Sequence, residues 1–291
     1  MSLQQAALDV AEPAPVRWRQ HAVTAGRIGL AVLLLVAWKV GADIAGPVYA
    51  ADPIKVAQRI IGDAVPDSIV SRFEALQWII GGTGSGSLWR HAYATLRLAA
   101  IGFAIGCFFG VALPFVLRRL PRLTNALEPY IMASVGIPKY ALVPLFILWF
   151  GIDDAPKLWL VGLLVFYPVF IAVFAGIRNV DRRLIDMARV AGASEAMISR
   201  EVVWNSLLPF FFASLRIALP RAVSAAIIGE FLVGNEGIGF LIESSRQSAD
   251  TTGVFAGVVV ATALVLAINA ILVRIDRSFS AWRPTDRHMQ L

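Results

Sequence analysis

Residues that could support catalysis are few in this sequence, and they form no catalytic pattern. The run GGTGSGS at 81–87 is glycine-rich and could approach a phosphate. A phosphate-binding loop needs a Gly-Lys-Ser/Thr step at the start of a helix, and this run has no lysine, so we interpret it as a hinge. The three histidines lack ligand-like spacing, and no nucleophile-and-base signature occurs. We therefore predict no catalytic residue, no metal site and no bound ATP.

Two basic residues inside apolar runs could contact a charged solute. Lys139 follows Pro138 near the middle of one run, and Arg216 lies within another. A charge deep in a membrane costs about 2.5–3.5 kcal/mol or more, so it usually has a function or a polar partner. We predict that Lys139 and Arg216 help to carry an anionic solute. Structural alternatives are that Lys139 reaches the membrane surface or pairs with freed carbonyls, and that Arg216 binds backbone or lipid phosphate.

A polar segment between two apolar runs, 179–205, has helical periodicity that an ordinary loop lacks. Its apolar residues form two stripes, Leu184, Ile185, Ala188 and Ala191, and then Ala196, Ile198, Val202 and Val203. Gly192 lies between the stripes and is a natural helix end, whereas Ser194 and Glu195 can start a helix. The pattern predicts two short helices joined at Gly192. They either transmit force to a partner or lie on the membrane surface without one.

Six apolar runs are long enough to position these residues within a bilayer, which needs roughly 20 residues per helix. They cover 28–45, 93–117, 125–149, 158–177, 207–231 and 253–273. The chain is 58% hydrophobic and 16% charged, with a mean hydropathy of +0.70. Soluble domains are about 45–50% apolar and about 25% charged. We predict an all-α polytopic membrane protein of about six transmembrane helices, with a tail at 1–27, a membrane domain at 28–275 and a tail at 276–291.

Two of these runs carry features that affect helix shape and packing. Gly102, Gly106 and Gly110 lie four residues apart on one helix face, where another helix backbone can approach closely. Pro138 and Pro144 each remove a backbone donor from the third run. We therefore predict close helix packing at the three glycines and a kinked or broken third span.

The distribution of Lys and Arg predicts the orientation of the chain. These residues concentrate in the two tails and in the segments around 118–122 and 178–200. Because cytoplasmic loops of membrane proteins are enriched in Lys and Arg, both termini and the 179–205 segment are expected in the cytoplasm. The net charge of +6 therefore indicates contact with membrane lipid rather than with nucleic acid.

Several motifs together resemble one transporter family. The segment DMARVAGAS at 186–194, followed by Val202, Val203 and LLP at 207–209, resembles the cytoplasmic EAA loop of binding-protein-dependent ABC importer permeases. LFILWFG at 145–151, GIRNVD at 176–181 and GIGFLI at 237–242 resemble its nitrate/sulfonate/taurine branch. Asp186 and Met187 depart from the usual Glu and Ala, and Glu236 places an acid where that branch often has small neutral residues.

The resemblance implies a type I importer fold in the inner (plasma) membrane. It implies a homodimer of six-helix subunits, a dimer of ABC ATPase subunits that binds ATP and Mg, and an external solute-binding protein. The transported solute would be a small anion such as nitrate, a sulfonate or a taurine-like compound. The residues that would contact the ATPase are Asp186, Ala188, Gly192, Ala193, Ser194 and Glu195.

The alternative function is ion-coupled secondary transport. Secondary transporters commonly contain inverted repeats and acidic residues within the membrane. We find no repeat, and Glu128 and Glu230 lie only at the ends of spans. The sequence therefore favours an ATP-driven importer.

Overall fold

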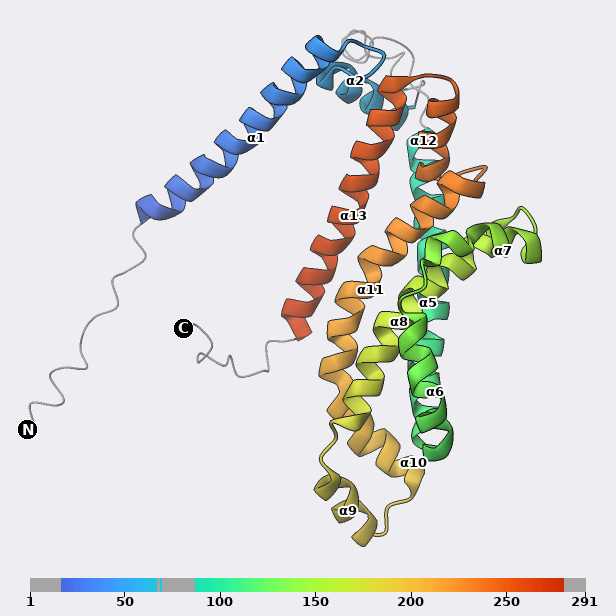
Figure 1. The fold of residues 1–291 in the computed structure, drawn as a ribbon. Helices are drawn as coiled ribbons and strands as arrows, with labels where there is room; N and C mark the ends of the chain where they lie inside the picture. Colours follow the sequence, from blue (N-terminus) through green and yellow to red (C-terminus); the bar gives the residue numbers. More distant parts are fainter. Residues whose placement is uncertain (1–16, 67–68, 70–86, 280–291) are drawn as a thin grey trace, which may run out of the picture.

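The computed structural model describes residues 17–66, 69 and 87–279, and every regular element there is helical (Figure 1). The helices are α1 (Arg17–Ala45), α2 (Pro53–Ala64), α5 (Ser87–Arg118), α6 (Pro121–Ser134), η1 (Lys139–Leu142), α7 (Val143–Phe150), α8 (Asp154–Arg178), α9 (Arg182–Val190), α10 (Glu195–Met197), η2 (Ile198–Val203), α11 (Trp204–Val233), α12 (Ile238–Gln247) and α13 (Thr251–Phe279). The predicted hinge at 81–87, apart from Ser87 at the start of α5, and most of both tails lie outside these residues.

The described helices include five that could cross a membrane, or six if a bent pair counts as one span. The bent pair is α6 with η1 and α7, which meet at an angle of 94°. Pro138 is the residue before η1, and Pro144 lies in the first turn of α7, where a missing amide does least harm. The predicted all-α membrane fold and the broken third span are thus confirmed.

Several helix boundaries differ from the apolar runs, those of α1 and α13 among them. α1 begins at Arg17 rather than near 28, and α13 continues to Phe279 rather than ending near 273. Hydropathy marks only the part of a helix that lipid covers. A helix can continue into water beyond the part that lipid covers. Hydropathy therefore missed the polar turns at the N-terminal end of α1 and at the C-terminal end of α13.

The core is built on the contact of α5 with α8, which lie side by side (Figure 1). Val161, Val165, Val169 and Val173 follow one another at intervals of four on α8 and are fully buried. The first three lie against glycines of α5. A Cβ added to Gly102 would be 2.5 Å from that of Val161, and one added to Gly110 would be 2.8 Å from that of Val169. The predicted close approach at the glycines is confirmed.

α11 packs on the same two helices, and the remaining elements lie around this core. α12 is a short helix between α11 and α13, at the opposite end of the molecule from α9 (Figure 1). α2 packs on α13, and α1 extends away from the other helices (Figure 1). The core therefore holds the two ends of the molecule at a fixed separation.

Candidate functional site

The candidate site is the 179–205 segment, which begins with a well-capped helix. The Asp181 carboxylate accepts a hydrogen bond from the Arg183 amide at 2.9 Å, and α9 follows. α9 ends before Gly192, whose φ of +81° is left-handed and favours glycine. The Gly192 amide donates to the Arg189 carbonyl at 2.9 Å, and the Ala193 amide donates to Ala188 at 2.9 Å. This is a Schellman termination, so Gly192 ends the helix as predicted.

The second half of the segment corrects the prediction of two short helices. The Ser194 hydroxyl caps the new helix by accepting from the Met197 amide at 3.3 Å. α10 then runs through the π-helical η2 into α11 without a break. No Gly or Pro occurs between 195 and 208 to stop the helix. The expected second helix is therefore the beginning of the long helix α11, and movement of the turn would be carried directly into that span.

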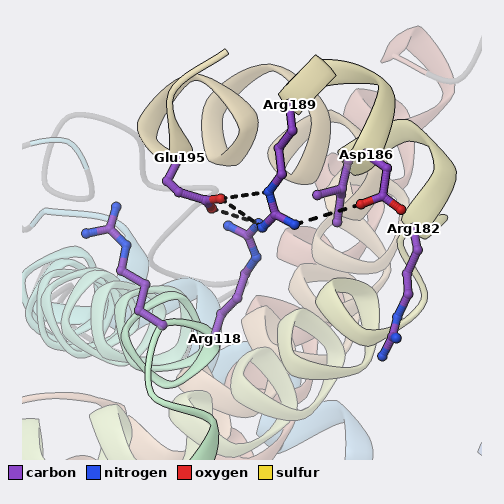
Figure 2. Close-up of a pocket in the computed structure, with 7 residues that line it drawn as sticks. Arg118, Arg182, Asp186, Arg189 and Glu195 are labelled. Carbon is purple, nitrogen blue, oxygen red and sulfur yellow. Dashed lines mark hydrogen bonds and ion pairs between the residues drawn. The ribbon is translucent and has the colours of Figure 1, made fainter. Parts of the chain in front are cut away.

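A set of ion pairs holds the turn closed and fastens it to α5 (Figure 2). Arg189 donates to a Glu195 carboxylate oxygen at 2.8 Å and 3.1 Å, and its guanidinium lies 3.8 Å from Asp186. The Glu195 carboxylate raises the pKa of Arg189, so this guanidinium stays charged. Arg118, at the end of α5, donates to the Ser199 hydroxyl at 2.6 Å and lies 3.8 Å from Glu195. The turn and α5 are thus joined by charged groups.

These residues border a cavity of about 380 Å³ in which basic side chains predominate (Figure 2). Its lining is Arg118, Arg119, Arg182, Ile185, Asp186, Arg189 and Glu195. The lining contains no Ser, Cys or His that could act as a nucleophile or base. No group of three or more metal-ligating side chains occurs in the described part of the chain.

The first predicted apolar stripe is divided between two environments. Ile185 and Ala188 pack against the core, but Leu184 is 47% exposed. Met187 and Val190 continue the exposed face, at 68% and 92% exposure. We call Leu184, Met187 and Val190 the α9 apolar face. Sequence periodicity missed Met187 and Val190, although an apolar side chain every third residue was the signal that could have revealed them.

The two basic residues predicted for a solute pathway have different surroundings. Lys139 donates to the carbonyls of Val135 at 2.5 Å and Ile137 at 3.1 Å, where the chain bends between α6 and α7. Its ammonium group also lies 4.6 Å from the ring centre of Tyr167. Pairing with freed carbonyls was one of the alternatives left open for Lys139. Arg216 lies on α11 with an exposed side chain.

Comparison with known proteins gives consistent matches. Residues 102–282 match the family described as binding-protein-dependent transport system inner membrane component. The riboflavin transport system permease protein RibX of Chloroflexus aurantiacus is 32% identical over 253 residues, covering 86% of this chain and 87% of that protein. The taurine transport system permease protein TauC of Escherichia coli is 27% identical over 271 residues, covering 92% and 94%.

A similar arrangement of helices occurs in a solved structure of the MetNI methionine ABC transporter in inward-facing conformations. The TM-score is 0.55 at 19% sequence identity, and the match covers 71% of this chain and 98% of that chain. At this identity the likeness establishes the fold alone.

Proposed function

This chain belongs to the family of binding-protein-dependent transport system inner membrane components, and from that premise we propose that α9 docks onto an ATPase subunit. It is the permease component of an ABC importer rather than an ion-coupled secondary transporter, and it is not itself an enzyme. Membership of the family implies a separate ATPase and a solute-binding protein as partners. ATP and Mg would be bound by the ATPase.

The α9 apolar face is the observation that carries the docking proposal. Three apolar side chains would be exposed to water at the tip of a charged loop, which is unfavourable unless a partner covers them. Arg189, Glu195 and Arg118 hold that tip rigidly on α5. Because the turn after α9 leads through α10 and η2 directly into α11, this rigid apolar surface can transmit a movement of the ATPase to the membrane helices. Asp186, Ala193 and Ser194 support this surface by pairing with Arg189, closing the Schellman turn and capping α10.

Docking at α9 fixes the proposed orientation of the chain. The α9 end would face the cytoplasm and the α12 end the exterior, where the binding protein delivers solute. Both tails, 1–27 and 276–291, would then lie in the cytoplasm around a membrane domain at 28–275. The concentration of Arg near α9 supports this orientation.

We further propose that two copies of the chain form a symmetric dimer with the pathway on its axis. The glycine face of α5 does not supply this interface, because it is already occupied by α8. The same contact leaves no room for a solute pathway between α5 and α8. The pathway would therefore lie between two copies of the chain, each forming one of its walls. One copy of this chain per ATPase pair in the purified complex would refute the dimer.

The proposed solute is a small anion such as nitrate, a sulfonate or a taurine-like compound. A taurine permease is among the relatives, and Lys139 and Arg216 would supply positive charge. Replacing either residue with Met should slow uptake of the anion without affecting complex assembly. Normal transport by both variants, or a neutral or cationic solute, would return these residues to structural roles.

Gly192→Val tests the docking surface, because no atom lies within 4 Å of a Cβ added at this position. Its effect must come from the left-handed backbone, which a β-branched residue adopts poorly. We expect normal membrane insertion but loss of solute-stimulated ATP hydrolysis. Gly192→Asn is the matched control, since Asn tolerates this conformation.

A second pair of variants probes the α9 apolar face directly. Val190→Lys should prevent co-purification with the ATPase, whereas Val190→Leu should not. Val190 is 92% exposed, so neither change disturbs packing within the chain. Equal recovery of the ATPase with both variants would show that α9 is not the docking surface.

A further inference from the structure

At the end opposite α9, a buried carboxylate holds the start of α12. Glu230 lies near the end of α11 and is 2% exposed, and Thr95 on α5 is fully buried. One Glu230 carboxylate oxygen accepts from the Thr95 hydroxyl at 2.8 Å and from the Gly239 amide at 3.0 Å. The Thr95 hydroxyl also accepts from the Ile238 amide at 2.9 Å. Side chains from two long helices thus satisfy successive amides of α12.

The backbone of α12 is fitted closely around this carboxylate. A Cβ on Gly237 would lie 2.1 Å from the Glu230 carboxyl carbon, and one on Gly239 would lie 2.0 Å from the Ile227 carbonyl oxygen. The Gly237 amide donates to His91 Nδ1 at 3.0 Å, which adds a second bond to α5. Glycine at these positions lets α12 approach α11, and the polar contacts then define its position. We call Glu230, Thr95, Gly237 and Gly239 the α12 clamp.

Ion pairs extend the α12 clamp to α8. Arg97 on α5 lies 3.2 Å from Asp154 at the start of α8 and 3.2 Å from Glu236 in the turn before α12. The buried ammonium group of Lys157 lies 2.6 Å from Asp154. The turn at 234–237 is therefore joined to both helices of the core.

α5 and α11, which are joined at the α12 clamp, are joined again at the opposite end, where Arg118 contacts Ser199 and Glu195. α5 carries Thr95 near one end and Arg118 at the other, roughly 35 Å away for 23 residues of helix. α11 carries Glu230 near one end and continues into the residues that Arg118 contacts at the other. Two helices fastened at both ends form a closed frame. A displacement of α12 is then shared by α5 and α11 and reaches Ser199 and Glu195.

We infer that Glu230 is a positioning residue that, through Thr95 and the α12 amides, couples the outer end of the permease to its ATPase-docking turn. The inference rests on the proposed function, because it assigns the binding protein to the α12 end and the ATPase to α9. Arg118 completes the coupling at the opposite end. Without the carboxylate, α12 would move independently of α5 and α11, and the signal that solute has been delivered would not reach the turn.

The experiment compares four variants of the permease in complex with its ATPase. Glu230→Ala removes both bonds to the carboxylate, and Thr95→Val removes the hydroxyl at nearly constant volume. Glu230→Gln is the conservative variant, because its amide oxygen can still accept from Thr95 and Gly239. Ser214→Ala is the matched control, since this buried hydroxyl on α11 donates to the Phe211 carbonyl of its own helix at 2.7 Å.

Two quantities are measured for each variant: hydrogen exchange of the amides at 237–239, and the ratio of ATP hydrolysis with and without solute-loaded binding protein. Glu230→Ala and Thr95→Val should raise exchange and lower the ratio about fivefold or more, the usual range of coupling between sites. Basal hydrolysis should persist, and Glu230→Gln and Ser214→Ala should behave as the unmodified protein.

The proposal is overturned if Glu230→Ala and Thr95→Val keep the unmodified stimulation ratio, whether or not exchange rises. It is also overturned if Ser214→Ala lowers the ratio equally, since general loosening of α11 would then explain the loss. Failure of the proposed function gives a different result. The unmodified complex would then show no stimulation by the binding protein, while the exchange measurement would still report whether Glu230 holds α12.

Discussion

A single methyl group at position 106 is expected to loosen the packing of α5 on α8. In Gly106→Ala the new Cβ would lie 2.5 Å from the Gly162 carbonyl oxygen and 2.6 Å from the Val165 Cβ. Ordinary van der Waals contact begins near 3.4 Å, so the helices must separate by about 1 Å. Overpacking of this kind costs about 1–3 kcal/mol, and the upper end applies because neither neighbouring atom is at the end of a flexible side chain.

The better helix propensity of Ala returns about 1 kcal/mol, which leaves a net destabilisation of about 2 kcal/mol. The free energy of unfolding, measured by denaturant titration in detergent micelles, tests this value. Gly41→Ala on α1 is the control, because nothing lies within 4 Å of its Cβ and only the propensity gain applies. Steric overpacking at position 106 is refuted if Gly106→Ala is as stable as, or more stable than, the unmodified chain, as Gly41→Ala is expected to be.

Three further changes have expected outcomes. Arg118→Ala removes the donor to Ser199, so hydrogen exchange at 195–203 should rise while exchange in α8 stays unchanged. Asp181→Ala removes the cap of α9 and should destabilise that helix by about 1 kcal/mol, whereas Asp181→Ser should retain it, as measured by exchange at 182–190. Lys139→Met leaves two carbonyls without their donor and should lower the free energy of unfolding by about 1 kcal/mol, in addition to slowing anion uptake; unchanged stability would show that these two hydrogen bonds do not hold the bend.

The spans could be predicted from the sequence because lipid imposes length and apolar composition on each helix separately. The break near Pro138 and the helix end at Gly192 were also predictable, since proline lacks an amide hydrogen and glycine tolerates positive φ. In both places a single residue determines the local backbone conformation. Tertiary partners were not needed for the inference.

Features that depend on several helices could not be predicted in the same way. Glu230 was noted only as an acid near the end of a span, because its partners Thr95 and Gly239 come from other elements. For a similar reason, the sequence did not show that the apolar stripe of α9 is divided, with Ile185 and Ala188 against the core and Leu184 exposed. Periodicity finds an apolar face, but it does not tell which side the core covers. The continuation of α10 into α11 was missed because Gly192 suggested a paired helix rather than an extended one.

The isolation of α1 has a consequence for how the protein is made. Leu33 and Val36 in its middle are 63% and 56% exposed, and its described contacts lie near one end, where Trp38 stacks on Phe255 and Lys39 pairs with Asp52. Because its stability in lipid comes from its own apolar side chains, α1 can leave the translocon before the helices that follow it are synthesised. It would then anchor the chain while the later helices are inserted, and Lys39 would meet Asp52 only after α1 itself has entered the membrane.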